Sequence, residues 1–311
     1  MTYMRITTKL INDNVINNLL INRTKLNDLQ EQLSSGQRVS RPSDDPTAAI
    51  SILSANLSLD QVERYTTNID NANSELDMAD EAILGTIDVI QRAKELATEA
   101  SNATSGSTEL AAIKSEIDQL IEQVKDAANT KFGSKYIFGG QVTETAPYSE
   151  DANGNIIYNG TPSTEDYQRK TEIGENITVD TNVTGVSIFG QYVEGDTTKQ
   201  SGLISTLKKL SNDLDSTSPD YDGIKASLDE MDDDLDTLLN AQATIGGTMS
   251  RLNMTKSKLE DDEITYKKFK SSADDFDMAK IISDISYQET ALEASLQVGA
   301  KAIQPSLLDY M

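Results

Sequence analysis

The chain has 311 residues, with 27 basic and 51 acidic side chains for a net charge of −24, and it lacks cysteine, histidine and tryptophan. The missing thiols and imidazoles exclude disulfides, thiolate or imidazole metal sites and serine–histidine relays. The acidic surplus repels phosphate backbones and anionic lipid, so we expect neither nucleic acid nor membrane as a partner. Carboxylate-only hydrolysis and oxygen-ligand metal sites stay compatible with this composition.

The first expected helix covers residues 8–35 and ends at Gly36. Its apolar residues recur at steps of three, four or seven and form one seam: Val15, Leu19, Leu26, Leu29 and Leu33. Asn12 and Asn22 also occupy seam positions, where a buried asparagine fixes register at a cost in stability. We therefore expect this helix to need partner helices.

A loop with two prolines follows at residues 38–47, and Asp45 with Pro46 forms a helix start. The next expected helix runs to about residue 103. Every seventh residue is apolar in one series, and small or polar residues dominate the series three places later. The two series are Val62, Ile69, Leu76, Ile83, Ile90, Ala97 and Tyr65, Ala72, Ala79, Thr86, Ala93, Ala100. A long coiled-coil helix is predicted. After a turn at residues 104–107 a shorter helix follows, with two apolar series: Leu110, Ile117, Val124 and Ile113, Leu120, Ala127.

Helical periodicity stops between residues 132 and 202, where Gly, Thr, Tyr, Asn and Val dominate. Two Asn-Gly pairs, at residues 153–154 and 159–160, predict tight turns. Residues 175–179 and 185–190 read as short strands, so we predict a small β-rich insertion. Residues 151–155 resemble a calcium loop, but the glycine stands in the fourth place, which favours a hairpin turn.

Helical patterns return at residues 203–214, break at 216–219, and resume in a second long heptad: Ile224, Met231, Leu238, Ile245, Leu252 and Leu259. Acidic residues gather at 229–236, and their helical spacing favours a solvated helix face over a cation site. The last expected helix covers residues 276–306, with the seam Ile282, Ile285, Leu292, Leu296, Ile303 and Leu307. The predicted fold is mainly α, a long coiled-coil rod built from both ends of the chain with a β-rich insertion.

Several motifs resemble the flagellin-related family of hook-associated proteins, in particular hook-associated protein 3. They are residues 4–7 (MRIT), 33–39 (LSSGQRV) with 41–46 (RPSDDP), 136–140 (YIFGG), 245–246 (IG) with 251–252 (RL), and 307–311 (LLDYM). The last motif departs from the usual Leu-Phe-Asp-Tyr-Leu at Leu308 and Met311, and the first implies that residues 1–3 precede the family's usual start. Flagellin is the nearest rival, but flagellins usually carry Ala-Asp-Asp-Ala-Ala in the loop and lack the YIFGG motif.

The resemblance implies a structural adaptor with no enzymatic activity and no cofactor or metal. Its implied domains are a terminal helical layer (4–40 and 276–311), disordered in the monomer, a helical rod (41–131 and 203–275) and an outer β-rich domain (132–202). Implied partners are the hook-side junction protein, flagellin, further copies in a ring, and the flagellar export chaperone and apparatus. The implied location is extracellular, on the flagellum, without a cleaved signal; no secretory signal or transmembrane run is seen in the sequence.

We expect the assembly seam to consist of Leu19, Leu26 and Leu33 packing against Leu292, Leu296 and Ile303. Candidate subunit contacts through the loop are Arg38, Asp44 and Asp45. Three alternatives remain: a flagellin-like filament subunit, a secreted coiled-coil adhesin and a carboxylate hydrolase, for which no particular pair of acids stands out.

Overall fold

The computed structural model describes residues 8–101, 106–151, 154–161, 169–215 and 219–303. It is mainly helical with a small strand region in the middle, so the predicted fold class is confirmed. The chain forms two compact units: a terminal unit (residues 1–61 and 262–311) and a central unit (62–261). The boundaries between the two units, at residues 61–62 and 261–262, fall inside two long helices. The terminal layer predicted from the sequence instead has its boundaries near residues 40 and 276. The three-layer division proposed from the sequence stays a prediction.

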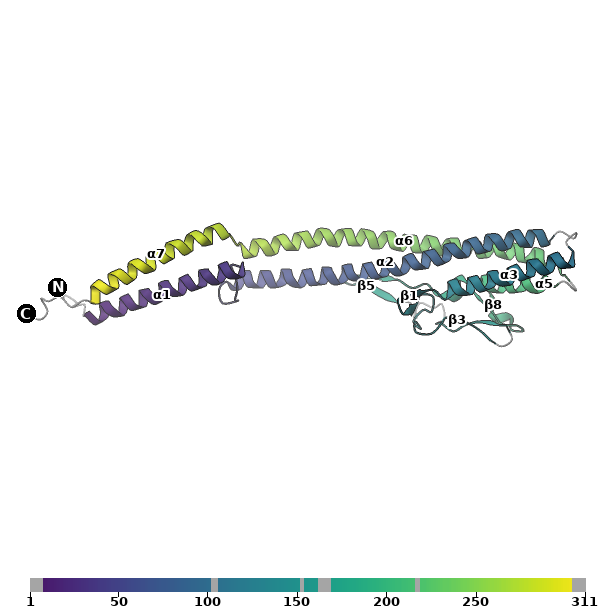
Figure 1. Ribbon diagram of the computed structural model, residues 1–311, viewed down its shortest axis with the longest axis horizontal. Coiled ribbons are helices and arrows are strands. Elements are labelled where there is room, and N and C mark those ends of the chain that lie inside the picture. The colour runs from purple at the N-terminus through teal and green to yellow at the C-terminus, as the bar shows by residue number, and fades with distance from the viewer. Residues whose placement is uncertain (1–7, 102–105, 152–153, 162–168, 216–218, 304–311) are drawn as a thin grey trace, which may run out of the picture. The chain divides into compact units, whose positions relative to one another are not determined.

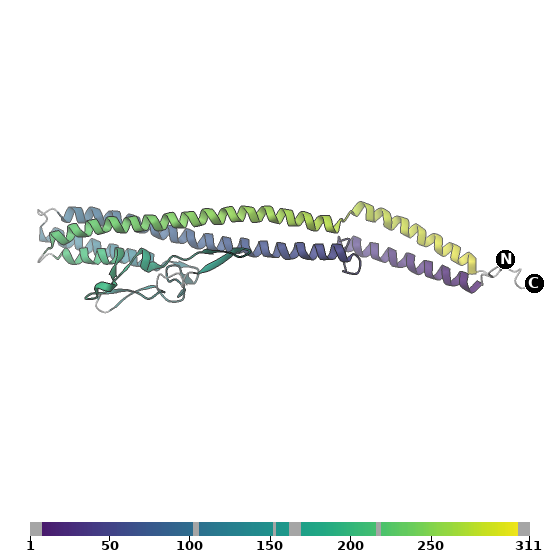
Figure 2. The ribbon, with the colours of Figure 1, turned by 180° about the vertical axis from the view of Figure 1, so that it is seen from behind.

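The terminal unit contains α1 (Thr8–Ser35), the beginning of α2 (Pro46–Ala100), the end of α6 (Tyr221–Asp274) and α7 (Met278–Ile303). Both ribbon views show α1 and α7 side by side (Figure 1 and Figure 2). Helix α7 begins two residues later than predicted because Asp277 caps it: its Oδ1 accepts the N–H groups of Ala279 (3.0 Å) and Lys280 (3.2 Å).

In the central unit, α2 and α6 bury the heptad residues that the sequence predicts. All members of both α2 series are buried, as are the six α6 residues from Ile224 to Leu259. Lys256 Nζ donates to Asp70 Oδ1 (2.6 Å), Asn73 Nδ2 donates to Asn253 Oδ1 (3.1 Å), and Lys94 pairs with Asp232. The residue numbers of the paired side chains increase along α2 and decrease along α6, so the two helices are antiparallel.

Helices α3 (Ser107–Ala128) and α5 (Gly202–Asp213) complete the helical part of the central unit. The α3 face that was predicted to be apolar is buried at Leu110, Ile113, Ile117, Leu120 and Val124. A polar contact joins the two helices, because Ser211 Oγ donates to Asp118 Oδ1 (2.6 Å) and accepts from Lys114 Nζ (3.2 Å).

The strands span residues 131–201, close to the predicted β-rich range. A four-stranded antiparallel sheet has the order β3-β4-β7-β8, and two hairpins pair β1 with β2 and β5 with β6. The bounds are β1 Lys131–Phe132, β2 Lys135–Tyr136, β3 Tyr148–Glu150, β4 Ile156–Tyr158, β5 Lys170–Gly174, β6 Ile177–Asp180, β7 Gln191–Tyr192 and β8 Gln200–Ser201. A 3-10 turn covers Thr197–Lys199.

The strand predicted at residues 185–190 is wrong, because Gly185–Ile188 forms a short helix, α4. Ser187 Oγ donates to the Thr184 carbonyl (2.7 Å), and this local bond competes with strand pairing. The predicted hairpin is confirmed in the described residues: β3 pairs with β4, and Asp151 Oδ1 accepts the Asn155 N–H (3.0 Å). Residues 152–153 of the predicted turn lie outside the described residues.

Aromatic residues form the core of the β-rich part. Phe138 and Phe189 are fully buried and meet edge to face, with ring centroids 5.0 Å apart. Tyr148 packs on Phe189 and donates its hydroxyl to the Gly190 carbonyl (2.9 Å); burial raises its pKa. The YIFGG motif at residues 136–140 therefore supplies the centre of this core.

No helix in the described ranges combines the length and the apolar character that a membrane span needs. Likewise, the described side chains form no group of three or more acids arranged to hold a metal ion. Within the acidic run, Asp229, Asp232, Asp233 and Asp236 are exposed on α6, which matches a solvated helix face.

Asp234 of α6 differs from its acidic neighbours because its side chain faces α5. Thr206 Oγ1 donates to its Oδ2 (2.6 Å), and burial raises its pKa from 3.8 to about 6. A raised carboxyl pKa means that the fold binds more protons than the unfolded chain between about pH 4 and pH 6, so stability falls as pH rises through this window. We predict that Asp234→Asn stabilises the chain by on the order of 1 kcal/mol at pH 7, after allowance for solvent screening.

This advantage should vanish near pH 4, where the native carboxyl is already neutral. Urea unfolding at pH 4 and pH 7 measures the difference, with the exposed Asp233→Asn as the matched control. An equal gain from Asp234→Asn at both pH values would contradict the titration.

Candidate assembly site at the chain ends

Four helix ends of the terminal unit meet at one joint, which we define as residues 36–46 and 273–278. Helix α1 ends at Gly36, whose φ of 67° suits glycine and whose N–H bonds to the Gln32 carbonyl (2.9 Å). Helix α6 ends at Asp274, and α2 and α7 begin in the same region. Residues far apart in sequence are thus held together at this joint.

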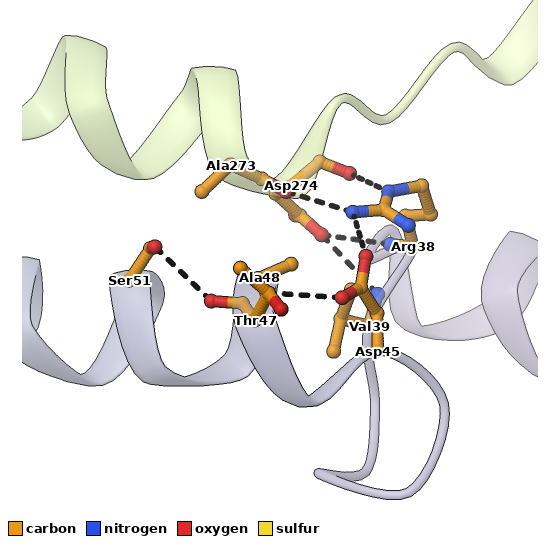
Figure 3. Close-up of polar contacts among 8 residues, drawn as sticks. All are labelled: Arg38, Val39, Asp45, Thr47, Ala48, Ser51, Ala273 and Asp274. Carbon is orange, nitrogen blue, oxygen red and sulfur yellow. Dashed lines mark hydrogen bonds and ion pairs between the residues drawn. The ribbon is translucent and has the colours of Figure 1, made fainter.

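Arg38 binds the last carbonyls of α6 (Figure 3). Its Nε donates to the Asp274 carbonyl (2.8 Å), and its Nη2 donates to the Ala273 carbonyl (2.9 Å) and to Asp45 Oδ2 (3.1 Å). A cation at a helix C-terminus satisfies carbonyls that lack helical partners and interacts favourably with the helix dipole. Arg38 is therefore a cap for α6.

Asp274 completes this contact from the other side (Figure 3). Its Oδ1 accepts the backbone N–H groups of Arg38 (2.9 Å) and Val39 (3.3 Å). Arg38 and Asp274 thus each bond their side chain to the backbone of the other. The side chain of Val39 is buried.

Asp45 caps the start of α2, as the sequence predicts. Its Oδ1 accepts the Ala48 N–H (3.1 Å) and its Oδ2 accepts from Arg38 (Figure 3). The Ala48 N–H and the Arg38 guanidinium hold the pKa of Asp45 below its ordinary value. An acid at a helix N-terminus is also favoured by the dipole.

Asp44 lies on the exposed side of the loop. Its Oδ2 accepts the Arg41 N–H (2.9 Å) in a tight turn that contains Pro42. The exposed Arg41 pairs with Glu31 of α1 (3.1 Å). Of the three predicted loop contacts, Arg38 and Asp45 join different helix ends within the chain, whereas Asp44 bonds only inside its own loop and is exposed. Their roles between subunits stay predictions.

Helix α1 presents its predicted seam to α7. Leu19, Leu26 and Leu33 are half-buried on one face, together with Val15, Asn22 and Leu29. Asn22 has intrachain partners: its Nδ2 donates to Ser295 Oγ (3.0 Å), and Gln288 Nε2 donates to its Oδ1 (3.2 Å). The asparagine at the seam is therefore hydrogen-bonded across the helix pair.

The α7 side differs from the prediction. Most of the buried or half-buried residues recur at steps of four and three, as Ile281, Ile285, Gln288, Leu292, Ser295 and Gly299, and Ala291 is also half-buried. Leu292 lies on this face, whereas Leu296 is 53% exposed and Ile282 is also exposed. The expected packing of Leu296 against the α1 leucines is thus absent from the monomer, and the Ile303 side chain lies outside the described residues. Helices α1 and α7 approach each other closely at Gly299, since a Cβ added there would stand only 2.9 Å from Val15 Cγ1.

Apolar side chains remain exposed on the other faces of the terminal unit. Most of the exposed large apolar residues among those described belong to this unit: Leu10, Ile16, Leu20, Ile21, Ile50, Leu53, Leu57, Ile264, Phe269, Met278, Ile282, Tyr287, Leu296 and Val298. Ile50, Leu53 and Leu57 follow helical spacing and form one stripe at the start of α2. Exposed apolar surface of this extent is typical of a protein-binding surface.

Comparison with known proteins matches residues 6–143 to the bacterial flagellin N-terminal helical region. The chain is 27% identical to flagellar hook-associated protein 3 of Escherichia coli over 280 residues, covering 85% of this chain and 86% of that protein. The chain is thus similar to flagellar hook-associated protein 3 along most of its length. It is also 26% identical to the flagellin of Bacillus subtilis, with 97% of each chain covered.

A solved structure of Bacillus cereus FlgL has 26% identity and a TM-score of 0.57, covering 70% of this chain and 99% of that one. The predicted resemblance is therefore confirmed in sequence and in fold. Over most of its length the chain is thus similar to flagellar structural proteins.

Proposed function

We propose that this chain is the structural adaptor that joins the flagellar hook to the flagellin filament and templates filament growth. The observation that carries the proposal is the nearly end-to-end relationship with hook-associated protein 3. In this role the chain associates with hook and filament components: further copies in a ring, the hook-side junction protein on one face and flagellin on the other.

The exposed apolar surface of the terminal unit supports this role. A monomer with such surface on α1, α2 and α7 gains free energy when neighbouring copies bury it, at about 25 cal/mol per Å² of apolar area. Leu20 and Leu296 are candidates for contacts between copies, because both stay exposed when α1 packs on α7. The layered domain organisation belongs to the same proposal. Neighbouring copies then stabilise a terminal unit whose α1 and α7 already pack on each other in the single chain; order of the chain ends only on assembly is not part of it.

Further parts of the proposal rest on the resemblance alone. They are export through the flagellar apparatus with a chaperone and without a cleaved signal, an extracellular location, and the loop contacts of Asp44. Enzymatic activity is not part of the proposed role.

The second candidate is a flagellin-like filament subunit, favoured by the similarity to the flagellin of Bacillus subtilis. The two roles differ in copy number and position. An adaptor is confined to the junction, whereas a filament subunit occurs along the whole filament.

Deletion of the gene in its host tests the proposal. Hooks without filaments, with flagellin monomers in the medium, are expected, and a plasmid copy of this chain should restore filaments. Normal filaments after deletion would contradict the adaptor role, and shortened but attached filaments would favour a filament subunit.

A further inference from the structure

The two long helices of the central unit form an open groove of about 650 Å³ to which the proposed function assigns no partner. Its lining consists of Gln91, Lys94, Glu95, Thr98 and Glu99 of α2 and Leu235 of α6. Helices α3 and α5 and the strands contact α2 and α6 through other residues, for example Arg92, Asp234 and Glu75. The groove therefore stays open to solvent beside the folded unit.

Two exposed leucines extend this groove beyond its lining. Leu84, which is 45% exposed, precedes Gln91 by one heptad and so lies on the same face of α2. Leu239, which is 44% exposed, follows Leu235 by one turn of α6. Among the described residues, three large apolar side chains are exposed on helices of the central unit: these two leucines and Met254. The exposed apolar surface of these helices is thus concentrated at the groove.

The antiparallel pairing of α2 and α6 brings the two leucines together. Lys94 pairs with Asp232, so Leu239, seven residues after Asp232, lies level with Ile87, seven residues before Lys94. Ile87 is less than one helical turn from Leu84. The two exposed leucines therefore flank one apolar strip, and the half-buried side chain at position 235 forms its floor.

Carboxylates border this strip without a matching number of cations. Asp88 and Asp236 each lie within about one turn of an exposed leucine, and Glu95 lines the groove. All three acids are exposed. Within the part of the chain that the structure describes, neither Asp88 nor Asp236 forms an ion pair, and the one lysine of the lining, Lys94, is already paired with Asp232. A partner that brings cations to this rim therefore gains electrostatic attraction.

The shape of the surface favours a helix as the occupant. A groove between two antiparallel helices offers rows of side chains between which the side chains of a third helix pack. Gly246 lies one heptad after Leu239 on the same face of α6, and without a side chain it allows another backbone to approach closely. Packing within the described chain does not require this glycine, since a Cβ added there would meet no neighbouring atom within 4 Å.

The charge of the rim limits the choice of partner. Nucleic acid and anionic lipid would be repelled by the carboxylates. A second copy that docked through the same face would place two acidic rims against each other, because a two-fold contact uses the same surface on both copies. A helix that carries lysine or arginine beside its apolar residues meets both the apolar strip and the acidic rim.

We propose that this groove binds an amphipathic helix of another protein, whose apolar side chains contact Leu84, Leu235 and Leu239. Lysine or arginine residues that flank those side chains pair with Asp88 and Asp236. This inference goes beyond the proposed function, which concerns the surface of the terminal unit, and does not depend on it.

A fluorescein-labelled helical peptide with two LKKLLKL repeats is the probe for this groove. Its anisotropy should rise saturably with one site per chain on titration with the full chain, whereas the corresponding LEELLEL peptide should not bind. Leu239→Gln should weaken binding about tenfold, because part of a leucine contact is lost. Met254→Gln is the matched control, since it removes another exposed apolar side chain of α6 outside the groove lining. Equal weakening by both variants, or no saturable binding, would overturn the site.

A second pair of variants tests the acidic rim. Asp88→Asn combined with Asp236→Asn should weaken binding of the lysine peptide by about threefold or more at low ionic strength, and by less at high salt. Asp229→Asn combined with Asp233→Asn makes the same change of charge at exposed positions of α6 outside the groove lining. Equal weakening by both double variants would show that the peptide follows the overall charge of the chain, which would refute the role of the rim.

Sedimentation velocity of the full chain alone separates another protein from a second copy as the occupant. We expect the natural chain and Leu239→Gln to sediment alike over the same concentration range. Self-association that Leu239→Gln removes would assign the groove to a second copy and overturn the choice of partner. The peptide titration and the sedimentation use the isolated chain, so their outcomes stand even if the adaptor function fails in the deletion experiment.

Discussion

Replacement of Asp274 by alanine is expected to open the joint at which the four helix ends meet. The substitution leaves the N–H groups of Arg38 and Val39 without their acceptor, at a cost of about 1–3 kcal/mol in the free energy of local opening. Hydrogen exchange of the Arg38 and Val39 amides measures this cost directly. We expect faster exchange at these amides and little change at the buried heptad of the central unit, because the joint lies in the terminal unit.

Asp274→Asn is the matched control because the amide keeps an Oδ1 that accepts both bonds. It should exchange nearly as slowly as the natural chain. If alanine and asparagine raised the exchange rate equally, the negative charge of Asp274 would be the important property and the role of Oδ1 as acceptor would be refuted.

The two faces of α1 are expected to respond differently to the same change. Leu26 lies in the seam with α7, so Leu26→Asp places a carboxylate in a partly apolar interface and should destabilise the terminal unit by about 2 kcal/mol or more. Leu20 is 57% exposed, so Leu20→Asp should change the stability of the monomer by less than about 0.5 kcal/mol. Thermal unfolding followed by circular dichroism measures both.

Filament attachment is the second measurement on these variants, and here the exposed positions are expected to be the sensitive ones. Leu20→Asp is expected to abolish filament attachment in a complemented deletion strain, because a charge then faces the neighbouring copy. Leu296→Asp should do the same from α7, where the side chain is also exposed. Asn17→Asp controls for added charge on α1 without loss of an apolar group, and it should restore filaments. Normal filaments with Leu20→Asp would mean that this face of α1 makes no contact between copies.

The long heptads could be predicted from sequence because their signal is local and repetitive. Isoleucine or leucine at every seventh place specifies one buried stripe, and Ile69, Ile83 and Ile90 are fully buried as expected. The seam of α7 was harder to predict because two series of apolar residues overlap on that helix. The buried one includes Gln288, Ser295 and Gly299, which a search for apolar residues passes over.

The partner of Arg38 gave no local signal either. Asp274 stands 236 residues away and belongs to no motif, so only the fold brings the two together. The Asn22 contacts with Ser295 and Gln288 are long-range in the same way. Asp45 was predictable because a helix cap is read from an acid directly before Pro46 and the helix that follows.

Locating the chain on intact flagella tests the adaptor claim most directly. The natural sequence has no cysteine, so Lys135→Cys on the exposed side of β2 introduces a single thiol for maleimide–gold labelling. Flagella from a strain with the natural chain show the background. The adaptor role predicts gold in one narrow band between hook and filament; gold along the whole filament would contradict it and establish a filament subunit.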